Sequence, residues 1–185
     1  MATSTRERII TAALTIAEER ESVEGVTVSL ESVARRAGLT KPGLMYHFPT
    51  KEALMLGLVD HAARRWSEQI RAEAGGDPGE LSAFDRHRAY VKVAMTAERS
   101  RGDYWVFSDA LYQPALSAAW HRHLTPWFAA AGLSGEARAL LTVARFAADG
   151  AWISEATALF RADDRDLAAA RVRALRLIDE AEVAA

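Results

Sequence analysis

The sequence contains no cysteine, which excludes disulfide bridges and metal sites built on thiolates. It has no apolar run long enough to cross a membrane, and its first residues, MATSTRERII, lack the apolar segment of a signal peptide. The net charge is only −2, so a contact with nucleic acid would have to come from a local basic cluster. We therefore expect a globular cytoplasmic protein with no membrane partner, and its 185 residues suffice for one long domain or two small ones.

Sequence motifs of catalysis and of cofactor binding are also missing. There is no Gly-x-Ser-x-Gly elbow, no Walker loop, no dinucleotide fingerprint and no Glu-x-x-His pair. His121 and His123 stand two apart, so on one helix they point in different directions and cannot bind one ion together. Asp163, Asp164 and Asp166 precede a predicted helix and are interpreted as capping and dipole residues. We expect no enzyme activity, no cofactor and no metal site.

The most specific pattern of the chain is the stretch 29–51, SLESVARRAGLTKPGLMYHFPTK. Its first part has apolar residues at helical spacing, begins at a good N-cap, Ser29, and stops at Gly38. Thr40 then caps a second helix whose first turn contains Pro42, where a missing amide costs nothing. A helix, a glycine-containing corner and a second helix form a helix-turn-helix, whose second helix enters the DNA major groove.

The charge of this stretch is consistent with DNA binding. Residues 32–51 include no acidic side chain and four basic ones, Arg35, Arg36, Lys41 and Lys51. Such a cluster on a nearly neutral chain suits phosphates, although the same pattern also fits a solvated helix pair within an all-α core. Lys41 is the best candidate for base contacts, because its ammonium can donate to guanine O6 and N7. Pro42 and Gly43 would bring the backbone close to the base edges.

Three segments resemble the signature of the tetracycline-repressor (TetR) family of transcriptional regulators. They are Gly38–Lys41, Leu44 with Tyr46–Phe48, and Thr50–Leu54. The resemblance covers about residues 5–58, and the rest of the chain matches only in its helical layout. It implies that phosphates are anchored by Ser29, Thr40, Tyr46, His47 and Lys51. One departure is Met45, which stands where the family usually has an aromatic residue.

The remaining pattern predicts helices throughout, separated by glycine and proline signals. Besides the helix-turn-helix pair, we expect helices over 5–21, 51–74, 81–100, 104–112, 115–124, 127–131, 135–160 and 164–183. Arg101–Asp103 is expected to be a turn, and Pro126 to open a separate short helix. The predicted fold is all-α, with a three-helix helix-turn-helix DNA-binding head in residues 1–58. A helical effector-binding and dimerisation body would occupy residues 59–185, joined to the head by the helix 51–74.

Aromatic side chains cluster in the predicted body, and they suit either a small-molecule cavity or a solid aromatic core. In the family the central body helices form an inducer pocket, so the resemblance favours a binding site for an unknown small effector. The candidate lining residues are Trp105, Phe107, Asp109, Tyr112, Gln113, Trp120 and Phe128.

The last two predicted helices have broad apolar faces with many small residues, which allow helices to approach closely. One neighbour would not cover such faces, so two copies of the chain could build a four-helix bundle; alternatively, both faces are covered within one chain. A two-fold DNA site also requires two copies of a helix-turn-helix. The candidate interface residues of a homodimer are Leu140, Val143, Ala147, Ala151, Leu167, Val172, Leu175 and Ile178.

Together these features lead us to expect a homodimeric DNA-binding transcriptional regulator. Its partners would be double-stranded operator DNA, a second copy of itself and a small-molecule effector that releases a repressor from a palindromic site. The alternative is an all-α enzyme or small-molecule carrier with a vestigial DNA-binding head.

Overall fold

The structure is a computed structural model that describes residues 4–19, 28–96, 101–110 and 113–185, with the side chains of 101–103, 109 and 110 left out. In these ranges the chain forms helices and no strands, which confirms the all-α prediction. The helices are α1 (Thr5–Glu19), α2 (Leu30–Arg36), α3 (Lys41–His47), α4 (Lys51–Ala74), α5 (Ala83–Ala94), α6 (Arg101–Ala110), α7 (Pro114–Phe128), α8 (Gly135–Thr157) and α9 (Asp164–Val183).

Two compact units divide the chain, and two helices contribute to both. The first unit comprises Met1–Ala63 and Ser100–Trp120, and the second comprises Arg64–Arg99 and His121–Ala185. The break in α4 falls between Ala63 and Arg64, although this helix runs without interruption for 24 residues. At 1.5 Å per residue α4 is about 36 Å long.

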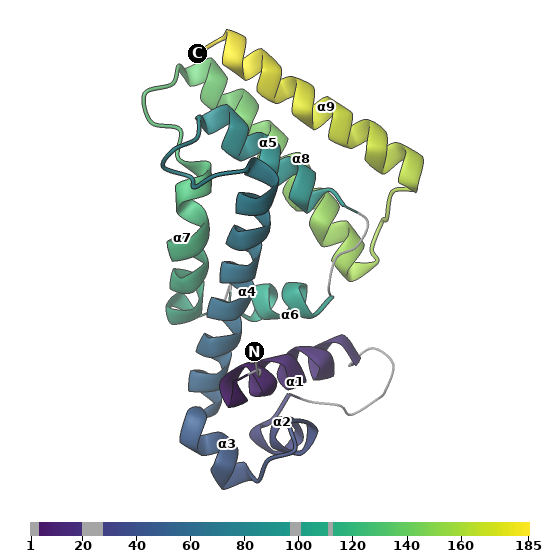
Figure 1. Ribbon diagram of the computed structural model, residues 1–185. Coiled ribbons are helices and arrows are strands. Elements are labelled where there is room, and N and C mark those ends of the chain that lie inside the picture. Colours follow the sequence, from purple (N-terminus) through teal and green to yellow (C-terminus); the bar gives the residue numbers. More distant parts are fainter. Residues whose placement is uncertain (1–3, 20–27, 97–100, 111–112) are drawn as a thin grey trace. The chain divides into compact units, whose positions relative to one another are not determined.

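In the first unit, α1 contacts α2 and α6, and α2 contacts α3 (Figure 1). Their shared core consists of apolar side chains from all of the first four helices and the residue after α3. Those with at most 1% of their surface exposed include Ile9, Val33, Leu44, Phe48, Leu54 and Leu58. Gly57 of α4 lies directly against this core, because a Cβ atom there would stand 2.6 Å from Cε1 of Phe48.

In the second unit, α8 and α9 run alongside each other, and α5 packs on both (Figure 1). Arg88 of α5 forms ion pairs with Asp179 and Glu182 of α9, at 2.9 Å from its Nη2 to the Asp179 carboxylate. Trp66 of α4 and Trp152 of α8 pack edge to face, with their ring centroids 5.3 Å apart. These contacts hold four helical segments around one apolar core.

Several expected boundaries agree with the structure. The range 51–74 forms one helix, the range 164–183 forms another, and Thr50 accepts a hydrogen bond from the Ala53 amide at 3.1 Å. Asp163 is an N-cap, since its carboxylate accepts from the Asp166 amide at 2.7 Å. The acidic cluster before the last helix therefore serves as a helix start.

Other expected boundaries were wrong. Arg101–Asp103 is not a turn but the first turn of α6, and Pro126 lies inside α7 rather than opening a new helix. The expected helices 81–100 and 135–160 are shorter, since α5 covers Ala83–Ala94 and α8 ends at Thr157. Residues 20–21, 97–100 and 111–112, expected to be helical, lie outside the described residues.

Pro126 is tolerated because it lies in the last turn of α7, where its missing amide removes one hydrogen bond from a helix that ends at Phe128. The neighbouring Trp127 is completely buried, and its apolar contacts in the core favour the helical backbone. At the end of α8 the backbone turns through left-handed residues, Ala158 (φ 56°) and Phe160 (φ 53°). Ser154 stabilises this turn by donating to the carbonyl oxygens of Leu159 and Phe160 at 2.8 and 3.0 Å.

Candidate functional site

The corner between α2 and α3 is built by local hydrogen bonds. Ser29 forms a capping box with Ser32: the Ser29 hydroxyl accepts from the Ser32 amide at 3.1 Å, and the Ser32 hydroxyl accepts from the Ser29 amide at 3.0 Å. Gly38 ends α2 with φ at 69°, a conformation that glycine adopts without steric cost. Thr40 then caps α3, accepting from the Gly43 amide at 3.2 Å.

Helix α3 has one buried face and one open face. Leu44 is fully buried, and Phe48, the residue after the helix, is 1% exposed. On the opposite side Lys41 and Pro42 are exposed, and the Tyr46 side chain is 86% exposed. This arrangement anchors α3 by its back and presents its front as a free surface, as a recognition helix requires.

Basic side chains border this surface. Arg35, Arg36, Lys41 and Lys51 are all exposed. Two of them have acidic partners: Lys41 is ion-paired with Glu31, and Arg36 with Glu19. The hydrogen bond from Lys41 lowers the pKa of the Glu31 carboxyl group. Sequence reasoning missed Glu31 because it lies just outside the basic stretch, although its position in the first turn of α2 is visible in the sequence.

The other candidate DNA residues have mixed surroundings. Ser29 is half-buried and engaged in its capping box, whereas Gly43 and His47 are half-buried within α3. The rings of Tyr46 and His47 meet edge to face at 5.2 Å. Met45, at the departure from the family pattern, is 39% exposed. The structure therefore brings all eight candidates together in one unit, around the α2–α3 corner and the start of α4.

Two arginines of α1 hold this corner in place. The Arg8 guanidinium donates to the carbonyl oxygen of Ala37 at 2.9 Å, which satisfies a free carbonyl at the end of α2. The Arg6 guanidinium lies over the Phe48 ring, 4.5 Å from its centroid. Both contacts tie α1 to the helix-turn-helix, and neither is visible from the spacing of residues in the sequence.

The candidate effector residues do not form one described cluster. Trp105, Phe107 and Trp120 belong to the first unit, where the Phe107 and Trp120 rings meet edge to face at 5.6 Å. Gln113 is exposed, while Tyr112 and the side chain of Asp109 lie outside the described residues. Phe128 alone among the candidates belongs to the second unit.

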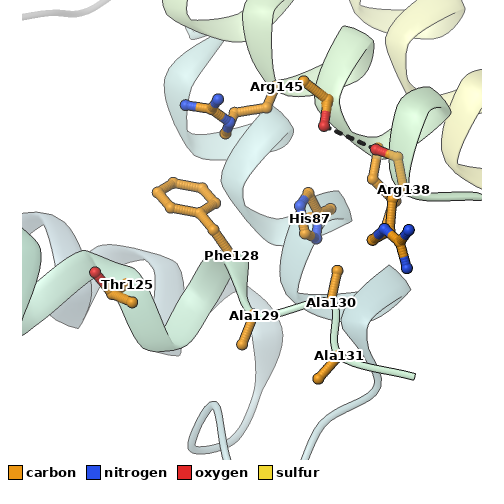
Figure 2. Close-up of a pocket in the computed structure, with 10 residues that line it drawn as sticks. His87, Thr125, Phe128, Ala129, Ala130, Ala131, Arg138 and Arg145 are labelled. Atoms are coloured by element: carbon orange, nitrogen blue, oxygen red, sulfur yellow. Dashed lines mark hydrogen bonds between the residues drawn. The ribbon is translucent and has the colours of Figure 1, made fainter. Parts of the chain in front are cut away.

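A cavity of about 570 Å³ lies in the second unit (Figure 2). We name it the α5–α8 cavity, and its lining residues are His87, Thr125, Phe128, Ala129, Ala130, Ala131, Arg138, Leu141, Thr142 and Arg145. Of the residues expected to line a pocket, it includes only Phe128. Sequence reasoning missed Arg138 and Arg145, although their spacing of seven places them on one face of α8.

His87 is the most enclosed polar residue of this cavity, with 4% of its surface exposed. Its Nδ1 lies 2.7 Å from the carbonyl oxygen of Ala83, which can only accept, so Nδ1 holds the proton. Burial lowers the pKa of His87, and the nearby guanidinium groups of Arg86 and Arg145 lower it further. The ring is therefore neutral near pH 7, with Nε2 as a hydrogen-bond acceptor.

The candidate interface residues of α8 and α9 divide by exposure. Val143 (52%), Val172 (47%) and Ala147 are exposed, whereas Leu140, Ala151 and Leu175 are half-buried. Leu167 and Ile178 are buried inside the single chain, at 8% and 0%. Two further apolar residues that the sequence analysis did not select, Phe146 (59%) and Ile153 (37%), are exposed on α8. The outer sides of α8 and α9 thus retain uncovered apolar surface.

In the part of the chain that the structure describes, no group of three or more histidine, aspartate or glutamate side chains is placed to hold a metal ion. In the same residues, no helix is both long and apolar enough to cross a membrane.

A helix-turn-helix whose second helix is exposed and bordered by basic side chains is the arrangement found in DNA-binding transcriptional regulators. Residues 9–58 match the model of the tetR family of bacterial regulatory proteins, and residues 85–179 match the tetracyclin repressor-like C-terminal domain. Because the second match alone covers about half of the chain, this protein belongs to the TetR family and is a TetR-family transcriptional regulator.

A curated relative is the HTH-type transcriptional regulator EthR of Mycolicibacterium smegmatis, 23% identical over 110 residues. That match covers 53% of this chain, and the chain spans about half (51%) of the relative's length. A TetR-family regulator from Rhodococcus sp. has a similar fold, with a TM-score of 0.67, 18% identity, and coverage of 97% of this chain and 99% of that one.

The multidrug binding protein EbrR in complex with imidazole has a TM-score of 0.63 and 22% identity, with coverage of 95% of this chain and 96% of that one. The same protein has also been solved with malachite green, ethidium and proflavin. At these identities the likeness establishes the common fold.

Proposed function

We propose that this regulator is a homodimeric repressor that binds a palindromic operator and is released by a small molecule. The main observation in support is the exposed front of α3, with Lys41 and an 86% exposed Tyr46, on a helix whose back is locked by Leu44 and Phe48. A large aromatic side chain that remains exposed on a basic surface is well suited to contact a DNA backbone or base edge.

In this proposal α3 enters the major groove. Lys41 exchanges its ion pair with Glu31 for guanine O6 and N7, and the cost is small because both partners are solvent-exposed. Pro42 and Gly43 approach the base edges. Phosphate contacts come from Ser29, Thr40, Tyr46, His47 and Lys51, which set register rather than sequence preference.

A dimer supplies the second copy of α3. The uncovered apolar side chains of α8 and α9, including Val143, Phe146 and Val172, would be buried in a four-helix bundle between two chains. Half-sites read by a helix-turn-helix dimer stand about 34–36 Å apart, so the separation of the two heads decides DNA affinity. Helix α4 contributes residues to both units and therefore offers a covalent route from body to head.

The effector acts by population shift in this scheme. The dimer would exist in conformations that differ in the separation of its two heads. A molecule that binds more tightly to a conformation with the wrong separation shifts the population away from the DNA-binding conformation. Linkage then requires that effector and operator weaken each other's affinity by the same factor. Binding of small molecules by the matched multidrug binding protein EbrR supports such a site in the family fold.

The proposed mechanism needs no catalytic step and no cofactor. The regulator would act in the cytoplasm, where the operator is. We keep the predicted division as part of the proposal: DNA binding is assigned to residues 1–58, and effector binding and dimerisation to residues 59–185. The competing proposal, an all-α enzyme or carrier with a vestigial head, predicts no DNA affinity.

The test is a mobility-shift titration of the purified chain on a duplex from upstream of its own gene, repeated at several salt concentrations, with light scattering for mass. We expect a dimer that binds the duplex with an affinity that falls steeply with salt. A monomer, or a protein without salt-sensitive affinity for any duplex, would contradict the proposal and favour the carrier.

A further inference from the structure

We propose that the α5–α8 cavity binds a small organic anion with a flat apolar body, such as an aromatic carboxylate. The class of ligand is argued from the cavity itself. Only the effect of that ligand on DNA binding rests on the proposed function. Its volume of about 570 Å³ is in the range of small-molecule sites.

The charges around the cavity are positive. Its charged lining residues are Arg138 and Arg145, and none of the ten lining residues is acidic. Arg138 and Arg145 project from one face of α8, two turns apart, or about 10 Å along the helix. In Figure 2 the Arg145 side chain extends above the Phe128 ring, while Arg138 lies beyond His87.

A third arginine adds to this charge. Arg86 donates through Nη1 to the carbonyl oxygens of Pro78 and Leu81 at 2.7 and 2.9 Å, and through Nη2 to that of Ala129, which lines the cavity. Arg138 likewise donates to a carbonyl oxygen, that of Leu133, at 2.6 Å. In the described part of the chain neither guanidinium is paired with a carboxylate, so both charges remain unneutralised.

Arg145 is only partly neutralised. Its Nη1 lies 3.3 Å from Oδ2 of Asp149, whose other carboxylate oxygen, Oδ1, accepts a hydrogen bond from the Tyr90 hydroxyl. Asp149 does not line the cavity. The guanidinium has five N–H donors, so the Asp149 contact leaves most of them for a ligand. The guanidinium groups of Arg138 and Arg145 have no acidic neighbour in the lining, so the cavity favours a carboxylate and disfavours a cation.

The apolar part of the ligand is specified by the rest of the lining. Phe128 is held edge to face by Tyr90, with centroids 4.8 Å apart, and Arg145 lies over its ring at 5.5 Å. Leu141 and three consecutive alanines complete the apolar wall. His87, neutral with Nε2 as acceptor, suits a hydroxyl or N–H group on the ligand. A ligand whose flat ring lies against Phe128 and whose carboxylate lies at a guanidinium would use the apolar wall and the positive charge of the cavity.

The experiment is isothermal titration of the full-length protein with 2-naphthoate, the neutral 2-naphthamide and the cation ethidium. We expect 2-naphthoate to bind about tenfold or more tightly than either of the others, the scale of a charge-assisted hydrogen bond. Arg138→Gln or Arg145→Gln, whichever removes the guanidinium that holds the carboxylate, should weaken 2-naphthoate about tenfold and leave 2-naphthamide unchanged. The matched control is Arg165→Gln, which removes the same charge from an exposed position at the start of α9, outside the cavity.

Equal affinity for the three probes, no binding of 2-naphthoate, or indifference to both substitutions would overturn the proposal. Since Arg138 is exposed, its substitution should preserve the fold even if that of Arg145 does not. A mobility shift of the upstream duplex in the presence of 2-naphthoate separates the proposed ligand class from the proposed repressor function. Binding of the anion by a protein that has no DNA affinity would uphold the ligand class and refute the repressor.

Discussion

The indole Nε1 of Trp127 donates a 2.8 Å hydrogen bond to the hydroxyl oxygen of Ser67, and the Trp127 side chain has no exposed surface. The bond joins α7 to α4 inside the second unit. It satisfies the only polar atom of a large aromatic side chain at a place that water does not reach.

Ser67→Ala should lower the free energy of unfolding by about 1–3 kcal/mol, because the buried indole N–H is left without a partner. Ser67→Ala combined with Trp127→Phe should cost less than the sum of the two single changes, since both polar groups are then gone. Chemical denaturation of the four proteins of this cycle measures the difference. Strict additivity would mean that the hydrogen bond adds nothing to stability.

Gly57→Ala should destabilise the first unit. The new Cβ would stand 2.6 Å from Cε1 of the buried Phe48, so ring or helix must shift, at a cost of about 1–3 kcal/mol. The better helix propensity of alanine offsets about 1 kcal/mol of this. Thermal unfolding checks the result, with Gly135→Ala as the control because nothing lies within 4 Å of that position. A melting temperature above that of the parent would refute the close contact.

Lys51→Ala should weaken binding to all duplexes alike and reduce the slope of affinity against salt by about one, because a single phosphate contact is lost. Lys41→Ala should instead reduce the preference for the operator over other sequences. Mobility shifts on operator and random duplexes distinguish the two effects. Lys92→Ala, in α5, is the control: its side chain pairs with Glu73, and DNA affinity should be unchanged. If Lys51→Ala affects one operator only, its assignment to phosphate is wrong.

Val143→Asp should convert the dimer to a monomer and abolish tight operator binding, since it places a charge in the proposed α8–α9 interface. Light scattering gives the mass, and a mobility shift gives the affinity. The matched control is Val183→Asp, near the C-terminus of α9, where the side chain is 89% exposed against 52% for Val143. A Val143→Asp protein that remains dimeric would place the interface elsewhere.

Stability should fall on acidification because of His87. Burial lowers its folded pKa below the ordinary value of 6.5, so the unfolded chain binds more protons between the two values. The stabilisation is complete above 6.5 and is lost as the pH falls toward the folded pKa. Melting curves from about pH 8 to pH 5 should therefore fall less for His87→Gln than for the parent protein. Exposed His121→Gln is the control and should follow the parent.

The helix-turn-helix could be predicted from sequence because it is determined locally. The caps at Ser29 and Thr40 and the left-handed Gly38 act within four residues of their own position, so residue type and spacing suffice. The same holds for α4, α9 and the Asp163 cap. Pro126 was misplaced because the local rule for proline was outweighed by the distant contact of Trp127 with Ser67.

The α5–α8 cavity depended on the tertiary structure. His87, Phe128 and Arg145 come from three helices, and no pattern within one helix shows that they meet. Tertiary packing likewise decided that Leu167 and Ile178 face inward while Val143 and Phe146 remain exposed. By itself the sequence determined the helix-turn-helix pair and the starts of α1, α4, α8 and α9, since capping and periodicity are short-range. Which side chains share a cavity was decided only by packing between helices far apart in the chain.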